Sequence, residues 1–353
     1  MVYLLGIDIG TSSTKTVLFN IKGEVIESAF DVYPMYQPKN GWAEQDPDDW
    51  WNATVTSVKE VMVKSKISPK DIKGIGLSGQ MHGLVMLGED NKPLKRSIIW
   101  CDQRTALECE QITSLVGEDK LTEITANPAL TGFTASKIMW VKNNEPDVYK
   151  KCKKILLPKD YIRYKLTGEF ATEVSDASGM QLLDVPKRKW SGYVLEKLDI
   201  DQALLAKVYE SPEVTGTVTS EAAALCNLCE GIPVVGGAGD QAASAIGNGI
   251  VKKGVVSATI GTSGVVLAHL DDISIDAKGR VHTFCHAVPN AWHIMGVTQS
   301  AGLSYKWFRD NFMTAEKFTA DQLDANPNAI IDKISATAPP GANGIVYLPY
   351  LMG

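Results

Sequence analysis

The sequence predicts an α/β protein built from two related lobes. The chain has 353 residues, more than one ordinary hydrophobic core takes, so about two domains are expected. Strand-like apolar runs alternate with helical patterns. The tetrapeptide Ile9–Ser12 recurs as Ile260–Ser263, each time between two strand-like runs. We therefore expect a first lobe over residues 1–247 and an incomplete second lobe over residues 254–353.

Composition excludes several other classes of protein. The net charge is −6, and the absence of Lys/Arg runs argues against a nucleic-acid surface. No apolar segment reaches the roughly 20 residues that span a bilayer, and no signal sequence precedes the first strand. The six cysteines do not have the spacing of a disulfide framework. These observations predict a cytoplasmic protein.

The first lobe is predicted to open with three antiparallel strands, at residues 2–9, 14–20 and 24–33, with a tight turn at "GTSS". A helix follows over residues 46–65, because Asp46 suits an N-cap and a proline follows it in the first turn.

Later in the first lobe we expect strands at 72–79 and 97–100, a hairpin between them, and a mostly helical middle over 104–166. Residues 231–250 predict a strand, a glycine turn and a helix.

The second lobe is predicted to begin with a strand–hairpin–strand at 255–270, followed by strands near 281–288 and 291–297. The chain ends on the apolar, strand-like run "GIVYLPYLMG". Termini are usually polar, so the sequence is expected to stop within a domain.

The two "IGTS" hairpins are candidate phosphate sites. Glycine and small hydroxyl residues at a turn let backbone amides converge on an anion. An ordinary hairpin is the alternative for either copy, but two copies suggest a clamp on one polyphosphate. Asp8 precedes the first copy and would suit Mg²⁺ through water; the alternative is that it only caps the turn. Lys15 follows and would bind the phosphate; the alternative is that it faces solvent. The candidate residues are Gly10, Thr11, Ser12, Ser13, Thr14, Lys15, Gly261, Thr262 and Ser263.

Polar residues at two strand ends are candidates for binding a small polyhydroxylated ligand. Gln80, Met81 and His82 lie between glycines, where the imidazole can reach ligand hydroxyls; an interior histidine is the alternative. Asp102 and Arg104 end the next strand and could line the same cleft or form a salt bridge with no ligand role.

Asp240 follows the run "GGAG" at a strand end. Open α/β sheets bind ligands at the carboxyl ends of their strands, and phosphoryl transfer needs one base for the nucleophile's proton. We interpret Asp240 as that base, with glycines that admit a substrate closely. A simple helix N-cap is the alternative.

Two other motifs carry no function. "GIGLSG" (74–79) matches a dinucleotide fingerprint, but its glycines lie within a predicted strand rather than at a strand–helix turn. "CNLC" (226–229) has zinc spacing but lacks further ligands, so it is interpreted as structural.

The sequence resembles the FGGY family of carbohydrate kinases along essentially its whole length. The matching segments, in family order, are "YLLGIDIGTSSTK", "GWAEQDPDDWW", "GLSGQMHG", "SIIWCDQR", "GFTASKIMWVKNNEP", "LLPKDYIRYKLTGE", "VVGGAGDQAASAIGNG" and "ATIGTSG". The resemblance implies a two-lobed actin/hexokinase/Hsp70-like ATPase fold with ribonuclease-H-like lobes. It also implies that Met81 and His82 bind sugar and that Asp240 is the base. Family members continue past Gly353 through an adenine-binding segment, so a C-terminally truncated chain is expected. By the same resemblance Gln241 is expected to contact the sugar, although such kinases often have Asn at this position.

The resulting hypothesis is an ATP- and Mg²⁺-dependent kinase that phosphorylates D-xylulose to D-xylulose 5-phosphate, with a homodimer possible. One alternative is another substrate, such as L-ribulose, glycerol or gluconate. A second is a non-kinase ATPase of the same fold, and a third is a chain that binds sugar without turnover.

Overall fold

A computed structural model describes residues 2–261 and 263–348. The chain divides into two compact units: Met1–Val255 with His269–Ile294, and Val256–Ala268 with Met295–Gly353. Strands β17 (Gly264–Leu270) and β19 (Trp292–Thr298) carry the chain between the units. Each unit is described by itself.

The first unit is organised on a mixed sheet in the order β13-β14-β5-β1-β2-β3, with β15 also paired to β5. The predicted opening meander is confirmed, because β1, β2 and β3 pair antiparallel in sequence order. β5 runs parallel to β1, β14 and β15. The strands are β1 (Tyr3–Ile9), β2 (Ser13–Asn20), β3 (Val25–Val32), β5 (Ile72–Gly79), β13 (Val214–Thr217), β14 (Pro233–Val235) and β15 (Ala238–Gly239).

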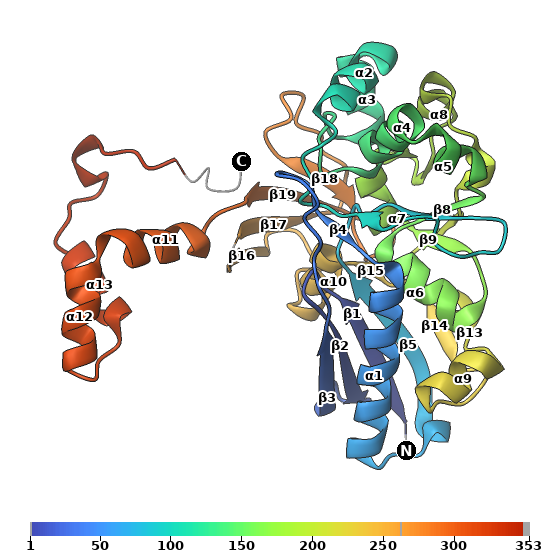
Figure 1. Cartoon of the computed structure of the whole chain (residues 1–353), viewed down its shortest axis with the longest axis horizontal. Helices are drawn as coiled ribbons and strands as arrows, with labels where there is room; N and C mark the ends of the chain where they lie inside the picture. Colours follow the sequence, from blue (N-terminus) through green and yellow to red (C-terminus); the bar gives the residue numbers. More distant parts are fainter. Residues whose placement is uncertain (1, 262, 349–353) are drawn as a thin grey trace. The chain divides into compact units, whose positions relative to one another are not determined.

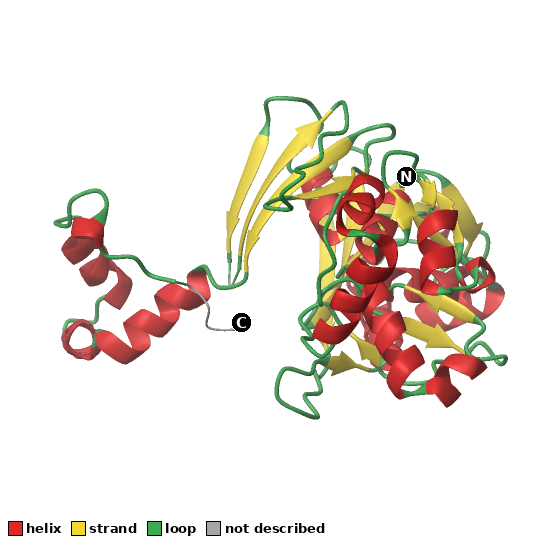
Figure 2. Cartoon of the chain, turned by 90° about the horizontal axis from the view of Figure 1, so that it is seen from above, coloured by secondary structure: helices red, strands yellow, loops and turns green. Residues whose placement is uncertain are grey.

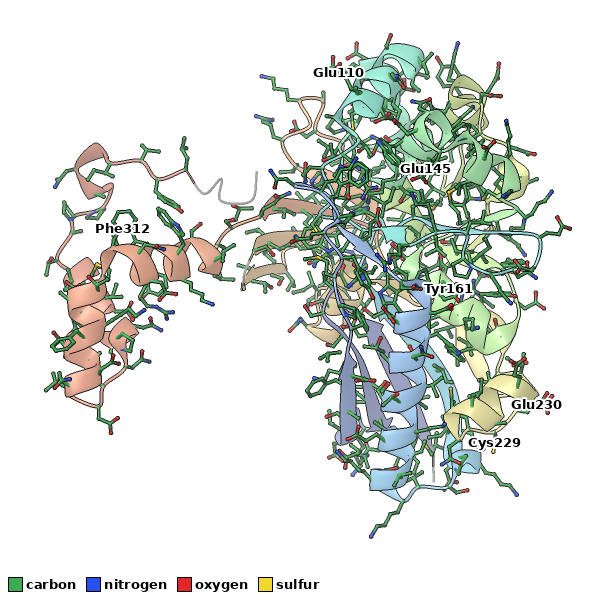
Figure 3. All side chains as sticks on the ribbon, in the orientation of Figure 1. Glu110, Glu145, Tyr161, Cys229, Glu230 and Phe312 are labelled. Atoms are coloured by element: carbon green, nitrogen blue, oxygen red, sulfur yellow. The ribbon has the colours of Figure 1, made fainter. Side chains whose placement is uncertain are left out.

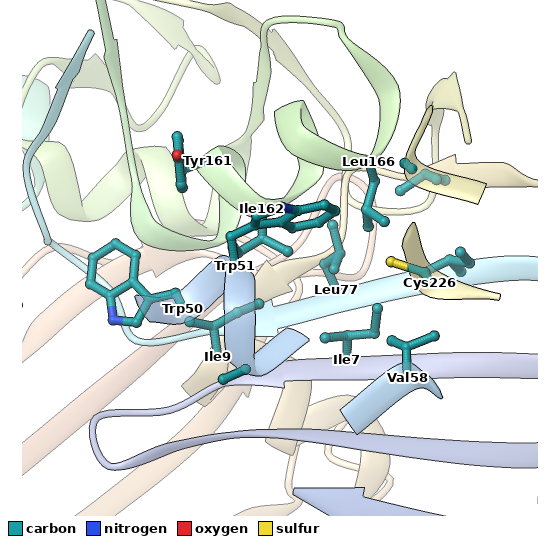
Figure 4. Close-up of a cluster of buried hydrophobic side chains, with 14 of the residues drawn as sticks. Ile7, Ile9, Trp50, Trp51, Val58, Leu77, Tyr161, Ile162, Leu166 and Cys226 are labelled. Atoms are coloured by element: carbon teal, nitrogen blue, oxygen red, sulfur yellow. The ribbon is translucent and has the colours of Figure 1, made fainter. Parts of the chain in front are cut away.

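Helix α1 (Pro47–Ser65) packs on β2 and β3 and contacts α6 (Pro158–Thr167) and α9 (Ser220–Cys226) (Figure 1). It begins as predicted, since the Asp46 side chain accepts a hydrogen bond from the Asp48 amide. Figure 4 shows the core between these helices and the sheet, including Trp50 and Val58 of α1. Burial of this apolar surface fixes the helices on the sheet.

A second core lies among the helices of the middle segment, α2 (Ala106–Val116), α3 (Glu118–Thr125), α4 (Thr134–Asn144), α5 (Pro146–Lys151) and α8 (Gly192–Leu198). Helices therefore dominate residues 104–166 as predicted, although β8 interrupts them. The remaining elements of this unit are β4 (Glu44–Gln45), β6 (Val85–Leu87), β7 (Ser97–Ile98), β8 (Lys154–Leu156), β9 (Ala171–Glu173), α7 (Val174–Ala177), β10 (Leu183–Asp184), β11 (Lys189–Trp190), β12 (Lys207–Tyr209), α10 (Asp240–Gly247), β18 (His282–Cys285) and the short 3₁₀ turns Pro69–Asp71, Ser178–Met180 and Gln202–Leu204.

In the second unit, β16 (Val256–Ile260) pairs antiparallel with β17, as predicted. After β19 its described residues form helices and loops only: α11 (Gly302–Phe312), α12 (Thr314–Gln322), α13 (Pro327–Ser335) and a 3₁₀ turn at Ala342–Gly344 (Figure 2). The strand expected near the C-terminus is wrong for residues 345–348. They are exposed and pair with no described strand, and a strand needs a partner for its backbone groups. Residues 349–353 lie outside the described part.

The register of three parallel strands decides which loops meet. Ile9 of β1 lies opposite Gly79 of β5, and Gly79 lies opposite Gly239 of β15. The residues that follow these strands therefore emerge at one edge of the sheet, where open α/β sheets bind ligands. No helix among the described residues has both the length and the apolar character to span a membrane.

Candidate functional site

The first hairpin turn, Gly10–Ser12, is held by side chains that bind its carbonyl groups. The Gly10 carbonyl accepts from the Tyr33 hydroxyl at 2.5 Å and from Gln80 Nε2 at 3.1 Å. The Thr11 carbonyl accepts from Gln45 Nε2 at 2.7 Å. These contacts fix the direction of the turn's peptide groups.

Two amides of the same turn have no partner among the described residues, whereas the Gly10 amide donates to the Ser13 carbonyl at 3.0 Å. Within the described ranges, the amides of Thr11 and Ser12 donate no hydrogen bond. The Thr11 hydroxyl accepts from Trp100 Nε1 at 2.9 Å, which fixes its rotamer. Since the turn's carbonyls accept hydrogen bonds and the amides of Thr11 and Ser12 have no described partner, these two amides can serve as donors, as an anion site requires.

The other predicted phosphate residues of this hairpin lie in β2. Ser13 is half-buried, Thr14 is buried, and Lys15 is exposed. Lys15 lies opposite Asp8 across the β1–β2 pair. The exposure of Lys15 matches the alternative in which its side chain faces solvent.

The turn of the second "IGTS" hairpin is one residue shorter than the turn of the first. Ile260 lies opposite Gly264, whereas Ile9 in the first copy lies opposite Thr14. The Gly261 amide donates to the Ser263 carbonyl at 2.8 Å, and the Gly261 carbonyl accepts from the Gly302 amide at 2.8 Å. Thr262 lies outside the described residues.

Asp240 is the first residue of α10 and follows β15 directly. The N-cap position belongs to Gly239, so the alternative of a simple N-cap at Asp240 is wrong. Its Oδ1 accepts from the Gln241 amide at 2.8 Å. Burial, and then the nearby charge of Asp8, raise the pKa of the Asp240 carboxyl to about 6. Asp240 thus becomes a stronger base than an ordinary aspartate while staying half-buried.

The glycines before Asp240 have a structural reason that the sequence did not reveal. A Cβ on Gly237, where φ is +76°, would lie 2.2 Å from the Leu77 carbonyl oxygen. A Cβ on Gly239 would lie 2.9 Å from Cγ of Met81. These glycines admit neighbouring parts of the chain, so internal packing by itself requires glycine at both positions, and close approach by a substrate stays a prediction.

The Met81–His82 pair is thereby brought to β15. Met81 is buried against Gly239, the residue before Asp240. His82 has a left-handed backbone, with φ of 70°, and its Nδ1 lies 2.9 Å from the Gly179 carbonyl oxygen. His82 is only half-buried, so it is not a sealed core histidine.

A buried lysine holds His82 in this conformation. Lys137 Nζ donates to the His82 carbonyl at 2.9 Å and to the Gly132 carbonyl at 2.6 Å. Burial lowers the pKa of Lys137 to about 7, against the opposing effect of Asp102. The sequence placed Lys137 within a family pattern but gave no reason for it.

Asp102 and Arg104 form an ion pair. Arg104 Nη2 lies 2.7 Å from Asp102 Oδ2 and 2.8 Å from Glu44 Oε1, and Asp102 also accepts from the Ala43 amide at 2.6 Å. The guanidinium lies over the Trp42 ring, 3.6 Å from its centroid. The contacts match the salt-bridge alternative, and a ligand role for either residue stays a prediction.

Sequence reasoning missed a buried charge network beside β15. Lys159 Nζ lies 2.8 Å from Asp160, 3.6 Å from Glu173 and 3.7 Å from Asp176. Burial alone would lower the pKa of Lys159, but the three carboxylates raise it. Lys159 also donates to the Gly236 carbonyl at 3.3 Å, so the network holds the start of the glycine run. The charged pair "KD" in the otherwise apolar run "LLPKDYI" was the available signal.

The two dismissed motifs are structural, as predicted. Gly74, Gly76 and Gly79 lie within β5. Cys226 is fully buried in the core, and Cys229, labelled in Figure 3, lies just after α9 and packs against that core. In the described part of the chain, no group of three or more His, Cys, Asp or Glu side chains could hold a metal ion.

Comparison with known proteins gives first the class of protein, the carbohydrate kinases, and then the family. Residues 3–247 match the family model described as "FGGY family of carbohydrate kinases, N-terminal domain". The chain belongs to the FGGY family of carbohydrate kinases, enzymes that transfer a phosphoryl group from ATP to a sugar.

Individual relatives lie within this family. The chain is 41% identical to the xylulose kinase of Bacillus subtilis over all 353 residues, spanning 68% of that protein. It is 34% identical to a gluconokinase of Bacillus licheniformis over 99% of this chain and 68% of that protein. The crystal structure of a xylulose kinase from Rhodospirillum rubrum matches 99% of this chain and 70% of that one, with a TM-score of 0.90 and 28% identity. The fold expected from the resemblance is confirmed.

The Gly237→Ala substitution is expected to lower the free energy of unfolding by about 3 kcal/mol or more, because a Cβ there meets backbone and strains a left-handed residue. The control is Gly76→Ala in β5, where a Cβ meets nothing within 4 Å. Urea denaturation measures both. Equal stability of the two variants would contradict the packing described for the glycine run.

The Asp240→Asn substitution is expected to stabilise the protein at neutral pH. The folded pKa of about 6 lies above the ordinary value of 3.8. Ionisation of Asp240 therefore lowers the free energy of unfolding as the pH rises from about 4 to 6, and the full loss remains above pH 6. Removing the charge should raise the free energy of unfolding by about 1–3 kcal/mol at pH 7.5, and the gain should vanish below about pH 4. Urea denaturation across pH tests this, and a variant less stable than the wild type at pH 7.5 refutes it.

Proposed function

We propose that this protein phosphorylates D-xylulose to D-xylulose 5-phosphate with ATP and Mg²⁺. The observation that carries the proposal is the position of Asp240. It is a half-buried carboxylate with a raised pKa, at the same sheet edge as the Gly10–Ser12 turn and the Met81–His82 pair. Relatives that are xylulose kinases, such as that of Bacillus subtilis, support the choice of sugar.

In the proposed reaction, an Asp240 carboxylate oxygen accepts the proton of the primary hydroxyl as that oxygen attacks the γ-phosphorus of ATP. The unpartnered amides of Thr11 and Ser12 bind phosphate oxygens. We assign the same task to Gly261, Thr262 and Ser263. Phosphoryl transfer asks mainly for such positioning and for neutralisation of charge.

The residues present fit a magnesium ion that arrives with the nucleotide. Asp8 is a half-buried carboxylate close enough to raise the pKa of Asp240. Mg²⁺ keeps several waters and binds phosphates plus one or two carboxylates, which agrees with the absence of a dedicated metal cage in the described residues. Asp8 would hold the hydrated ion, which neutralises phosphate charge.

A neutral sugar is favoured over a sugar acid such as gluconate. Two cations of the candidate site are already occupied: Lys137, which contacts His82, binds two carbonyl groups, and Arg104 binds two carboxylates. The Lys137 side chain is fully buried and the Arg104 side chain is 1% exposed, so neither offers an exposed charge to the carboxylate of a substrate. All six cysteines are free, which supports the proposed cytoplasmic location; the homodimer stays a prediction.

The Asp240→Asn substitution is expected to lower kcat by about 10²- to 10⁴-fold with little change in the KM for sugar, because it removes the base but keeps the shape. The matched control is Asp272→Asn, which changes an exposed carboxylate. In the wild type, kcat/KM should rise with pH through about 6, as Asp240 loses its proton. Near-normal turnover in Asp240→Asn would remove Asp240 from the mechanism.

The substrate is tested by rates across D-xylulose, L-ribulose, glycerol and gluconate. The proposal expects the highest kcat/KM for D-xylulose. A higher value for another member identifies that substrate instead, ATP hydrolysis indifferent to every sugar indicates a non-kinase ATPase, and binding without turnover indicates a sugar-binding chain.

A further inference from the structure

Two histidines from distant parts of the first unit flank the same two phenylalanines. The ring centroid of Phe133 lies 4.9 Å from that of His82 and 5.7 Å from that of His282. Phe284 lies 6.2 Å from His82 and 5.6 Å from His282. Both phenylalanines are buried, whereas both imidazoles are half-buried. The two histidines therefore share one aromatic cluster and keep part of their surface accessible.

The tautomer of His82 follows from its partner. Nδ1 lies 2.9 Å from the Gly179 carbonyl oxygen, and a carbonyl can only accept, so Nδ1 carries the hydrogen. Burial and then the charge of Lys137 lower the pKa of His82 to about 3, so the ring is neutral at pH 7. Nε2 of His82 therefore presents a lone pair.

The tautomer of His282 is fixed in the same way through Asn127. Asn127 Nδ2 donates to the carbonyl groups of Thr125 at 3.0 Å and Thr283 at 2.9 Å, which identifies its other side-chain atom as Oδ1. That oxygen lies 2.9 Å from His282 Nδ1 and can only accept, so this Nδ1 also carries the hydrogen. Burial lowers the pKa of His282, so its Nε2 presents a lone pair as well.

Both lone pairs are available to a ligand. Across residues 2–261 and 263–348, no side chain or backbone group donates to Nε2 of His82 or of His282. Neither atom is fully buried without a partner, so each keeps some exposure to solvent. Two neutral acceptors in one cluster suit two hydroxyl groups, each of which has an O–H to donate. An ionised carboxylate offers no such donor.

We propose that His282 Nε2 accepts a hydrogen bond from a hydroxyl group of the sugar, beside the hydroxyl that His82 binds. This inference rests on the proposed function and adds a substrate-binding residue to it. A strand around His282 is predictable from the sequence, but a role for the residue is not. A metal between the imidazoles is the competing use of two such nitrogens, but the described residues supply no third ligand.

Two substitutions separate the atoms of the His282 ring. In His282→Asn, the amide lies near the position of Nδ1 and can still donate to Asn127, but nothing replaces Nε2. In His282→Gln, the longer side chain carries an amide oxygen near the position of Nε2. Isothermal titration calorimetry of the full chain with D-xylulose, without nucleotide, measures the Kd, and thermal melting measures whether each variant is folded.

The expected result is a Kd for D-xylulose raised about 3- to 30-fold in His282→Asn and partly restored in His282→Gln, with the KM for ATP unchanged. Wild-type affinity in a folded His282→Asn protein would overturn the inference and leave the proposed function standing. If His282→Asn does not fold, the Kd of His282→Gln decides: an affinity more than 100-fold weaker than the wild type would overturn the inference, since the amide oxygen should replace Nε2.

The failure of the proposed function would be visible in the wild type. If the wild type binds no sugar of the panel, both proposals fail. If it binds another sugar instead of D-xylulose, the proposed substrate fails, and the same comparison of Kd values with that sugar decides the role of His282.

Discussion

The close approach of β15 to β5 is the constraint on which the site depends. The Gly237 backbone lies against the Leu77 carbonyl, and Gly239 lies against Met81, at distances that a Cβ would not allow. This packing aligns the ends of β1, β5 and β15, so that the residues after Ile9, Gly79 and Gly239 emerge together. Burial is the main cause of the raised pKa of Asp240, and the nearness of Asp8, which follows from this alignment, raises that pKa further.

Buried cations are used within the protein as internal supports. Lys159 neutralises part of a group of three carboxylates and binds the Gly236 carbonyl, and Lys137 binds the carbonyl of left-handed His82. Burying an ammonium group is costly unless it is paired or hydrogen-bonded. Here the two buried lysines hold the backbone at Gly236 and at His82. Neutral imidazoles and amides are left as the groups available to a ligand.

Local patterns predicted the elements that depend on local physics. The meander β1–β3 and the start of α1 at Asp46 were predictable from alternation and capping. The position of Asp240 at a strand end was predictable from "VVGGAGD", but the reason for its glycines was not, because Leu77 and Met81 come from another strand and its following loop. The proposed role of His282 was not predictable from the sequence, because it depends on Asn127 and Phe133, which lie far away in the sequence. The apolar run near the C-terminus suggested a strand, but residues 345–348 have no described partner strand.

The proposed mechanism requires that Asp240 accepts the proton of the hydroxyl that is phosphorylated. A crystal structure of the full chain with D-xylulose bound would show whether the two groups meet. A carboxylate oxygen of Asp240 is expected about 2.6–3.2 Å from the oxygen at C5 of the sugar. A bound sugar whose C5 hydroxyl lies out of reach of Asp240 and against a different basic group would contradict it.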